Sequence, residues 1–319
     1  MDNNSLKAQG NLIMPPLKDA RFRRWRTMPK DIHETIVAGV FLLPAICFFA
    51  VFVVYPIIVS IFTSFFNYSI NRFEFLGFGN YINLFKDEVF LKSMKNTIVL
   101  VIGVVPFIIL FSIFVALTIY QKSSLVCSFF RGVFYLPVVT GTVSVIVVWK
   151  WIFDPLSGIL NWFLETLGMI NQPIMWLGDK HYALWSILLV LFTTSIGQPI
   201  VLYIAALSNL DKSHIEAAEI DGATNWQVFK YIKWPCIMPT TLYVVVITII
   251  NSFQCFSLIQ LLTSGGPNYH TSTVMYLVYE TAFKLTQFGY ANAMGVILAV
   301  VIGFFSILQF KFFSNKVEY

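Results

Sequence analysis

Six long apolar stretches decide what this chain can fold into. They lie at residues 36–66, 96–120, 133–152, 182–207, 239–262 and 293–313. As an α-helix, each is long enough to cross about 30 Å of hydrocarbon. Hydrophobic residue types make up 57% of the chain and charged types only 12%, which is well below the charged fraction of a soluble domain. The sequence therefore predicts an all-α, polytopic membrane protein with six transmembrane helices.

The basic residues predict how these helices are oriented. Many of the 21 Lys and Arg residues precede the first apolar stretch, in a basic N-terminal segment at 1–35. With that segment in the cytoplasm, most of the basic residues lie on the inner side, as the positive-inside rule requires. Six crossings then place the C-terminus in the cytoplasm as well. Because a basic cluster beside a span is typical of a topology signal, the net charge of +5 does not predict a nucleic-acid partner.

The central portions of the six stretches contain no Asp, Glu, Lys or Arg. Proton- and sodium-driven transporters generally bury ionisable groups that hold the coupling ion. The chain also lacks the G-x-x-x-x-G-K-[ST] phosphate loop, so it does not hydrolyse ATP by that route. If the chain moves a solute, we therefore expect the energy to come from another subunit and the solute to be neutral.

Uncharged polar residues lie within the third, fourth and fifth stretches. Ser and Thr commonly serve only to hydrogen-bond neighbouring helices, but Asn and Gln are more costly to bury. Asn251 and Gln254 are three residues apart and are expected to share a helix face. Hydroxyl and amide groups of this kind suit a neutral solute with many hydroxyl groups. The polar positions are Thr140, Thr142, Ser144, Thr193, Thr194, Ser195, Gln198, Thr248, Asn251, Ser252, Gln254, Ser257 and Gln260.

The predicted cytoplasmic loop at 211–235 has the pattern of two short helices around a turn. Gly222 lies where the first helix should end, a position that often needs a positive φ. Pro235 is expected to end the second helix. A rigid, well-capped helix beside the membrane is suited to docking a partner. Two pairs of residues have the spacing of a capping box: Ser213 with Glu216, and Thr224 with Gln227.

The loop resembles the EAA motif of ABC importer permeases. In that family the motif forms the coupling helix, which seats in a groove of the ATPase subunit. Trp234 stands where the family usually has Leu. The resemblance implies the type I ABC importer (MetI-like) permease fold, with a first transmembrane helix at 36–66 and a five-helix core at 94–313 that carries the coupling loop. The residues that match the motif, and are implied to contact the ATPase, are Glu216, Ala217, Ala218, Asp221, Gly222, Ala223, Phe229 and Pro235.

A second resemblance concerns the run Leu258–Thr263 and the Ser-Gly-Gly-Pro sequence that follows it. The run is similar to the exit of the fifth span in carbohydrate permeases of the MalF type. This implies an oligosaccharide cargo, and the overall resemblance points to raffinose-type α-galactosides. Cys255 and Val138 stand where that group has Asn and Tyr. Aligned positions imply a substrate path along Thr142, Thr193, Gly197, Thr248, Ser252 and Cys255, to which side-chain chemistry adds Gln198 and Asn251.

The resemblance also implies the partners. They are a homologous second permease subunit, two ATPase subunits that bind ATP and Mg, and an extracellular solute-binding protein, all at a bacterial plasma membrane. No cofactor or catalytic residue is expected on this chain itself. An ABC permease for another neutral solute, a secondary transporter and a non-transporting membrane scaffold remain as alternatives. From Thr271 to Leu285 we expect an amphipathic helix along the membrane interface.

Overall fold

The computed structural model describes residues 32–314. Most of the predicted basic segment 1–35 and the end of the C-terminal tail therefore lie outside the described residues. The chain divides into two compact units, Met1–Ile58 and Val59–Tyr319. The first unit holds α1 (Ile32–Phe49), the π-helical turn η2 (Ala50–Val54) and the start of α2 (Tyr55–Thr63). The π-helical turn ends two residues before Pro56, which lacks an N–H donor.

Within residues 32–314, five helical segments are long and apolar enough to cross a membrane, and there are six if a bent pair of helices is counted as one span. The pair is Ser124–Val139 with Thr142–Ile152, bent by 97°. The first span ends at Thr63, three residues before the predicted boundary, because a β-hairpin follows. The five segments are Gly39–Thr63, Glu88–Ile119, Ala183–Ser208, Asn225–Phe253 and Phe288–Lys311.

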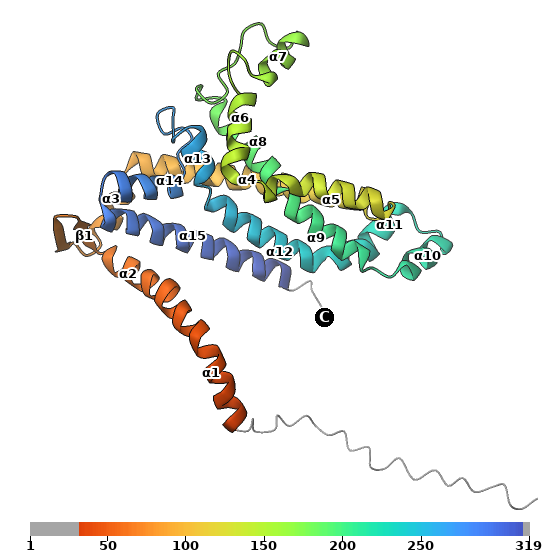
Figure 1. Ribbon diagram of the computed structural model, residues 1–319, viewed down its shortest axis with the longest axis horizontal. Coiled ribbons are helices and arrows are strands. Elements are labelled where there is room, and N and C mark those ends of the chain that lie inside the picture. Colours follow the sequence, from red (N-terminus) through yellow and green to blue (C-terminus); the bar gives the residue numbers. More distant parts are fainter. Residues whose placement is uncertain (1–31, 315–319) are drawn as a thin grey trace, which may run out of the picture. The chain divides into compact units, whose positions relative to one another are not determined.

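The second unit is built around α4 (Glu88–Ile119), a helix of 32 residues. It begins eight residues before the predicted span because Asp87 caps it. The Asp87 carboxylate accepts hydrogen bonds from the backbone N–H groups of Val89 at 2.8 Å and Phe90 at 3.3 Å. The buried side of α4 packs against α8 (Ala183–Ser195), α9 (Gly197–Ser208) and α12 (Trp234–Phe253), and α12 packs in turn on α15 (Phe288–Ser314) (Figure 1).

The third predicted span, 133–152, is not a single helix. Instead α5 (Ser124–Val139) ends at Thr140, and α6 (Thr142–Ile152) leaves at 97° from Gly141. Pro137 and Gly141 explain the break, because Pro removes a helical donor and Gly weakens the helix. The bend carries α6 and the short helix α7 (Ile159–Thr166) away from the axis of α5 (Figure 1).

The fifth predicted span, 239–262, is also wrong in its boundaries. The helix runs without interruption over Asn225–Phe253 and consists of α11 (Asn225–Val228), the π-helical turn η3 (Phe229–Lys233) and α12. Pro235 therefore does not end a helix; it lies at the start of α12, where the preceding π-helical turn accommodates its missing donor. Gln254 ends α12, and Ser257 and Gln260 belong to a separate helix, α13 (Ser257–Leu262).

Several shorter elements lie outside the spans. A hairpin of β1 (Phe66–Ser69) and β2 (Arg72–Phe75) was not anticipated by the all-α prediction; α3 (Gly79–Leu84) follows it. The predicted helix at 271–285 is present as α14 (Val274–Tyr279) and the π-helical turn η4 (Glu280–Lys284), which contact α15. Within the second unit, β1 lies at one end and the loop with α10 and α11 lies at the other (Figure 1).

The start of α15 packs directly on the hairpin, and this contact generates a testable prediction. A Cβ atom at Gly289 would collide with the carbonyl oxygen of Phe66, whereas a Cβ at Gly295, also on α15, would meet open space. We expect Gly289→Ala to lower the free energy of unfolding by about 1–3 kcal/mol, as overpacking does. Gly295→Ala should leave it unchanged or raise it. Thermal unfolding in detergent measures both variants, and equal melting temperatures would contradict the contact.

Candidate functional site

The predicted coupling loop forms a compact helix–turn–helix. Its first helix, α10 (Lys212–Ile220), is capped by Asp211, whose carboxylate accepts a hydrogen bond from the Ser213 backbone N–H at 2.9 Å. The same bond lowers the pKa of the Asp211 carboxyl group. The predicted capping box of Ser213 with Glu216 is therefore wrong, because Asp211 takes the capping position and Ser213 lies inside the helix.

The turn between the two helices has the predicted chemistry. Gly222 has a φ of +79°, which confirms the need for glycine. The N–H of Ala223 donates to the carbonyl of Ala218 at 2.9 Å and closes the turn. The capping box at the start of α11 is also confirmed: the Thr224 N–H donates to the Gln227 side chain at 2.7 Å, and the Gln227 N–H donates to the Thr224 hydroxyl at 3.4 Å.

Few side chains anchor this loop, and several apolar ones are exposed. Ile215 and Val228 are buried. By contrast, Ile220 is 86% exposed, Trp226 68% and Tyr231 67%. Among the residues that match the motif, Ala218, Ala223 and Phe229 are half-buried, and the exposed ones are Glu216, Ala217, Asp221, Gly222 and Pro235. The loop thus presents acidic and apolar groups together on a surface without a partner in the described chain.

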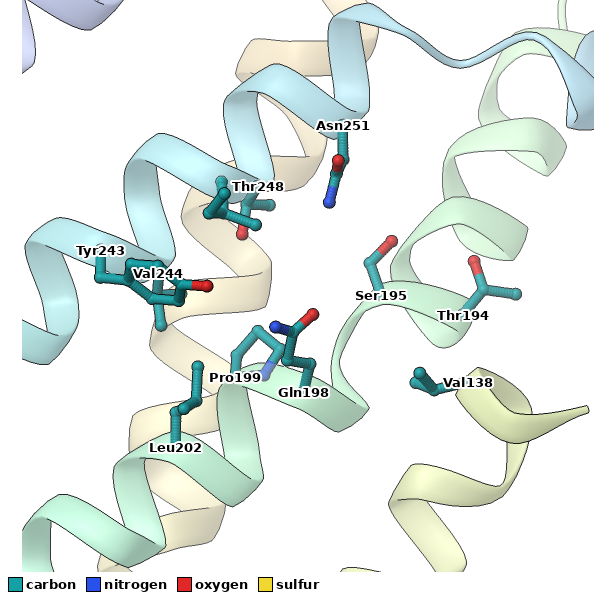
Figure 2. A pocket seen from close by; sticks show the side chains of 11 residues that line it. Val138, Thr194, Ser195, Gln198, Pro199, Leu202, Tyr243, Val244, Thr248 and Asn251 are labelled. Atoms are coloured by element: carbon teal, nitrogen blue, oxygen red, sulfur yellow. The ribbon is translucent and has the colours of Figure 1, made fainter. Parts of the chain in front are cut away.

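A cavity of about 190 Å³, lined by both polar and apolar side chains, lies between α8, α9, α12 and the end of α5. Figure 2 shows the amides of Gln198 and Asn251 and the hydroxyl of Ser195 directed toward the same space, from α9, α12 and the end of α8. Each of these groups both donates and accepts hydrogen bonds. The cavity is lined by Val138, Thr194, Ser195, Gln198, Pro199, Leu202, Tyr243, Val244, Ile247, Thr248 and Asn251.

A second cavity of about 320 Å³ adjoins the first and shares Val138 and Thr194 with it. It lies where the helices break, at the α5–α6 bend and at the α12–α13 interruption. None of the residues that line either cavity, all in the described part of the chain, carries a charge. The second cavity is lined by Pro137, Val138, Thr142, Val145, Leu191, Thr194, Gln254, Cys255, Phe256, Ser257 and Leu258.

Five of the eight residues predicted for the substrate path line these cavities: Gln198, Thr248 and Asn251 the first, Thr142 and Cys255 the second. The other three line neither. The Thr193 hydroxyl donates to the Val190 carbonyl at 2.9 Å, and the Ser252 hydroxyl donates to the Thr248 carbonyl at 2.7 Å. Gly197 is a packing position, because a Cβ there would collide with the Phe134 carbonyl oxygen of α5.

Tyr243 is a lining residue that sequence reasoning missed. Its side chain is half exposed and lies beside the first cavity (Figure 2). The sequence could have identified Tyr243, because Tyr243, Ile247 and Asn251 are spaced four residues apart. This spacing places all three on one face of a helix. Thr194 and Ser195 line the first cavity too, although they were identified only as polar positions.

Comparison with known proteins gives consistent matches. The sequence model of a family described as "Binding-protein-dependent transport system inner membrane component" matches residues 78–319. The probable ABC transporter permease protein YurN of Bacillus subtilis is 31% identical over 90% of this chain and 99% of its own length. The multiple sugar-binding transport system permease protein MsmF of Streptococcus mutans is 32% identical over 87% and 95%. The lactose transport system permease protein LacF of Rhizobium radiobacter is 30% identical over 85% and 91%.

A solved structure has the same fold. It is a chain of a bacterial ABC transporter involved in the import of the acidic polysaccharide alginate. The TM-score is 0.79 at 24% sequence identity, and the match covers 91% of this chain and 99% of that one. At this identity the likeness supports the fold alone.

The capping box makes the loop's local stability testable. Thr224→Ala removes the hydroxyl that caps α11, so we expect a loss of about 1 kcal/mol of local stability. Hydrogen exchange of the amides at 224–228 should become faster while exchange in α4 stays unchanged. Thr118→Ala is the matched control, because the Thr118 hydroxyl bonds only to its own helix, at Phe114. Exchange rates in the loop that do not respond to Thr224→Ala would contradict the capping role.

Proposed function

The chain belongs to the family of binding-protein-dependent transport system inner membrane components, and from this premise we propose that it forms half of the translocation path of an ATP-driven sugar importer. The family match, the curated permease relatives and the multi-pass helical fold support its assignment as an ABC importer permease. The finer parts of the proposal are the coupling loop, the neutral oligosaccharide cargo and the partner subunits. Each rests on its own observation.

The observation that carries the proposal is the loop at 211–235. It is rigidly capped, exposes Ile220 beside acidic side chains, and is held to the rest of the unit by few buried residues. An ATPase subunit with a groove of complementary chemistry could seat this surface. ATP and Mg would bind to that partner subunit, and this chain would contribute no cofactor site.

The helices next to the loop give it a mechanical route to the cavities. On one side, α9 ends at Ser208, shortly before α10 begins at Lys212. On the other, α11, η3 and α12 form one continuous helix of 29 residues. The first cavity is lined by Gln198 of α9 and by Asn251 of α12. A displacement of the loop would therefore move two walls of the cavity, so a ligand of the ATPase can bias the cavity between two states.

The chemistry of the cavities supports a neutral, many-hydroxyl cargo. Their polar groups are hydroxyls and amides, with Tyr243 beside them, and a charged cargo would call for a charged lining group. Relatives are named as lactose and multiple sugar-binding permeases. We therefore propose an oligosaccharide, and raffinose-type α-galactosides remain the specific prediction. An ABC permease for another neutral solute is the nearest alternative.

The described surface also supports the proposed partners. Val133, Leu136, Val139 and Val143 on α5 and α6 are 50–72% exposed, as expected of a face that packs on a second, homologous permease. The end of the unit opposite the coupling loop would receive an extracellular solute-binding protein. This arrangement corresponds to a bacterial plasma-membrane protein with both termini in the cytoplasm.

The coupling loop is tested by Gly222→Pro. Proline fixes φ near −65° and cannot adopt the +79° of this residue. We expect the variant to reach the membrane, to lose association with the ATPase subunits and to lose sugar uptake. Gly168→Pro is the matched control, because Gly168 is also exposed with a positive φ of +67° but lies outside the loop. Co-purification of the ATPase measures the outcome, and normal association of Gly222→Pro would refute the coupling role.

The substrate path is tested by Asn251→Leu and Gln198→Leu. Each replaces an amide of the cavity by an apolar group, so the loss of a hydrogen bond should lower uptake by about 2- to 10-fold while ATPase association is retained. Ser252→Ala is the control, since the neighbouring Ser252 hydroxyl bonds within its own helix. Uptake is measured in vesicles over a panel of neutral sugars that includes lactose and raffinose. Uptake that follows an ion gradient without ATP would favour the secondary-transporter alternative.

A further inference from the structure

The β1–β2 hairpin has two chemically different faces. In its register Phe66 pairs with Phe75 and Tyr68 pairs with Phe73, while the alternate pairs are Asn67 with Glu74 and Ser69 with Arg72. Because successive side chains of a strand point to opposite faces, one face is aromatic and the other is polar. We call these the aromatic face (Phe66, Tyr68, Phe73 and Phe75) and the polar face (Asn67, Ser69, Arg72 and Glu74).

The polar face is directed toward a cavity of about 620 Å³. Asn67, Ser69 and Arg72 of the polar face line it on the hairpin side, together with the edge residue Tyr68. Residues of α3, of the segment before α15 and of the start of α15 line it on the other side. The orientation of the hairpin is fixed by Asn80, which is buried and whose amide donates to the carbonyls of Ser64 at 2.8 Å and Phe66 at 2.9 Å. Phe73 and Phe75 of the aromatic face, which do not line the cavity, therefore cannot turn toward it without breaking these bonds.

The aromatic face continues the apolar surface of the preceding span. Phe62, in the last turn of α2, is 57% exposed, and its ring centroid lies 4.8 Å from that of Phe66. The Phe66 ring contacts Phe73 at 4.6 Å, stacked, and Phe75 at 5.2 Å, edge to face. Phe73 is 57% exposed and Phe75 74%. A chain of aromatic rings thus leads from the end of a membrane span onto the outer strand of the hairpin.

We propose that the aromatic face lies in the lipid interface at the end of the first span, opposite the coupling loop. The span ends at Thr63 and the hairpin begins at Phe66, so the hairpin is tethered within a few residues of the membrane surface. Tyr side chains concentrate at that level of a membrane, and Phe side chains on the apolar side of interfacial elements lie at the boundary between headgroups and acyl chains. The hairpin pairs the backbone groups of its two strands with each other, which lowers the cost of lying against lipid. This anchor does not depend on the cargo or on the coupling loop.

Lipid contact at the aromatic face would also fix how deep the neighbouring helices lie in the membrane. The Asn292 side chain of α15 donates to the Thr63 hydroxyl at 2.7 Å and accepts from the Ser60 hydroxyl at 3.1 Å. Tyr68 also packs on Phe288 at the start of α15, with 5.3 Å between ring centroids. Through these contacts, lipid at the aromatic face would hold both the end of the first span and the start of the last one in place.

The experiment places a fluorescent label on each face of the hairpin. The exposed native thiols are removed with Cys47→Ala and Cys236→Ala, and Phe75→Cys is labelled with a small fluorophore in the full chain, assembled with its partner subunits in liposomes. Arg72→Cys, also exposed and on the same strand but on the polar face, is the matched control. Lipid that carries a nitroxide near its headgroup acts as the quencher.

We expect the label at Phe75→Cys to lose most of its emission in nitroxide lipid and the label at Arg72→Cys to keep most of it. Phe73→Cys, on the same face as Phe75, should behave like Phe75→Cys and guards against a local effect of one substitution. Equal quenching at the two faces, or none at Phe75→Cys and Phe73→Cys, would overturn the proposal. Protection of the Phe75→Cys label by added solute-binding protein instead of by lipid would overturn it too, because the face would then dock a protein.

Discussion

A peptide group in hydrocarbon has no water to bond, so every backbone donor and acceptor of a span must find a partner within the protein. Unbroken helices meet this requirement by themselves, which is why Glu88–Ile119 can cross as one regular element. A helix can break inside the membrane only where other protein groups or a water-filled cavity receive the freed backbone. The positions of the breaks therefore determine where a polar path can form.

In this chain the breaks gather around the two adjoining cavities. The α5–α6 bend follows Pro137, the junction of α8 and α9 at Ile196 precedes Pro199, and α12 stops at Gln254 before α13. Pro137, Pro199 and Gln254 all line one or other cavity. Each proline leaves a carbonyl one turn earlier without its helical donor. The irregular backbone and the polar side chains thus occur together because each makes the other tolerable in a membrane.

Mean hydropathy predicted the spans because it depends only on the average over a window of residues. A break in the helix within that window does not change this average. The breaks themselves were missed for the same reason: Pro137 and Gly141 lie in a run that is apolar overall. Local chemistry predicted Gly222 and the Thr224 cap correctly.

Which of the predicted polar residues line the cavity depends on their positions around the helix axis. Ser252 and Asn251 are adjacent in sequence and equally polar, yet they are separated by about 100° around the helix, so only Asn251 reaches the space. The hairpin carried a period-two pattern at 66–75, but its pairing depends on Asn80 and α15.

The two ends of the second unit have opposite physical roles in the proposed function. At one end, the coupling loop is attached through α9 and α12 and exposes groups for a protein partner. At the other, Asn292 and the hairpin tie α15 to the last turn of α2. A force on the loop produces useful movement only if some part of the unit stays fixed relative to the membrane. With the hairpin end held at the lipid interface, a force on the loop moves α9 and α12 relative to α15 and so changes the shape of the cavities. The unit as a whole does not shift as a rigid body.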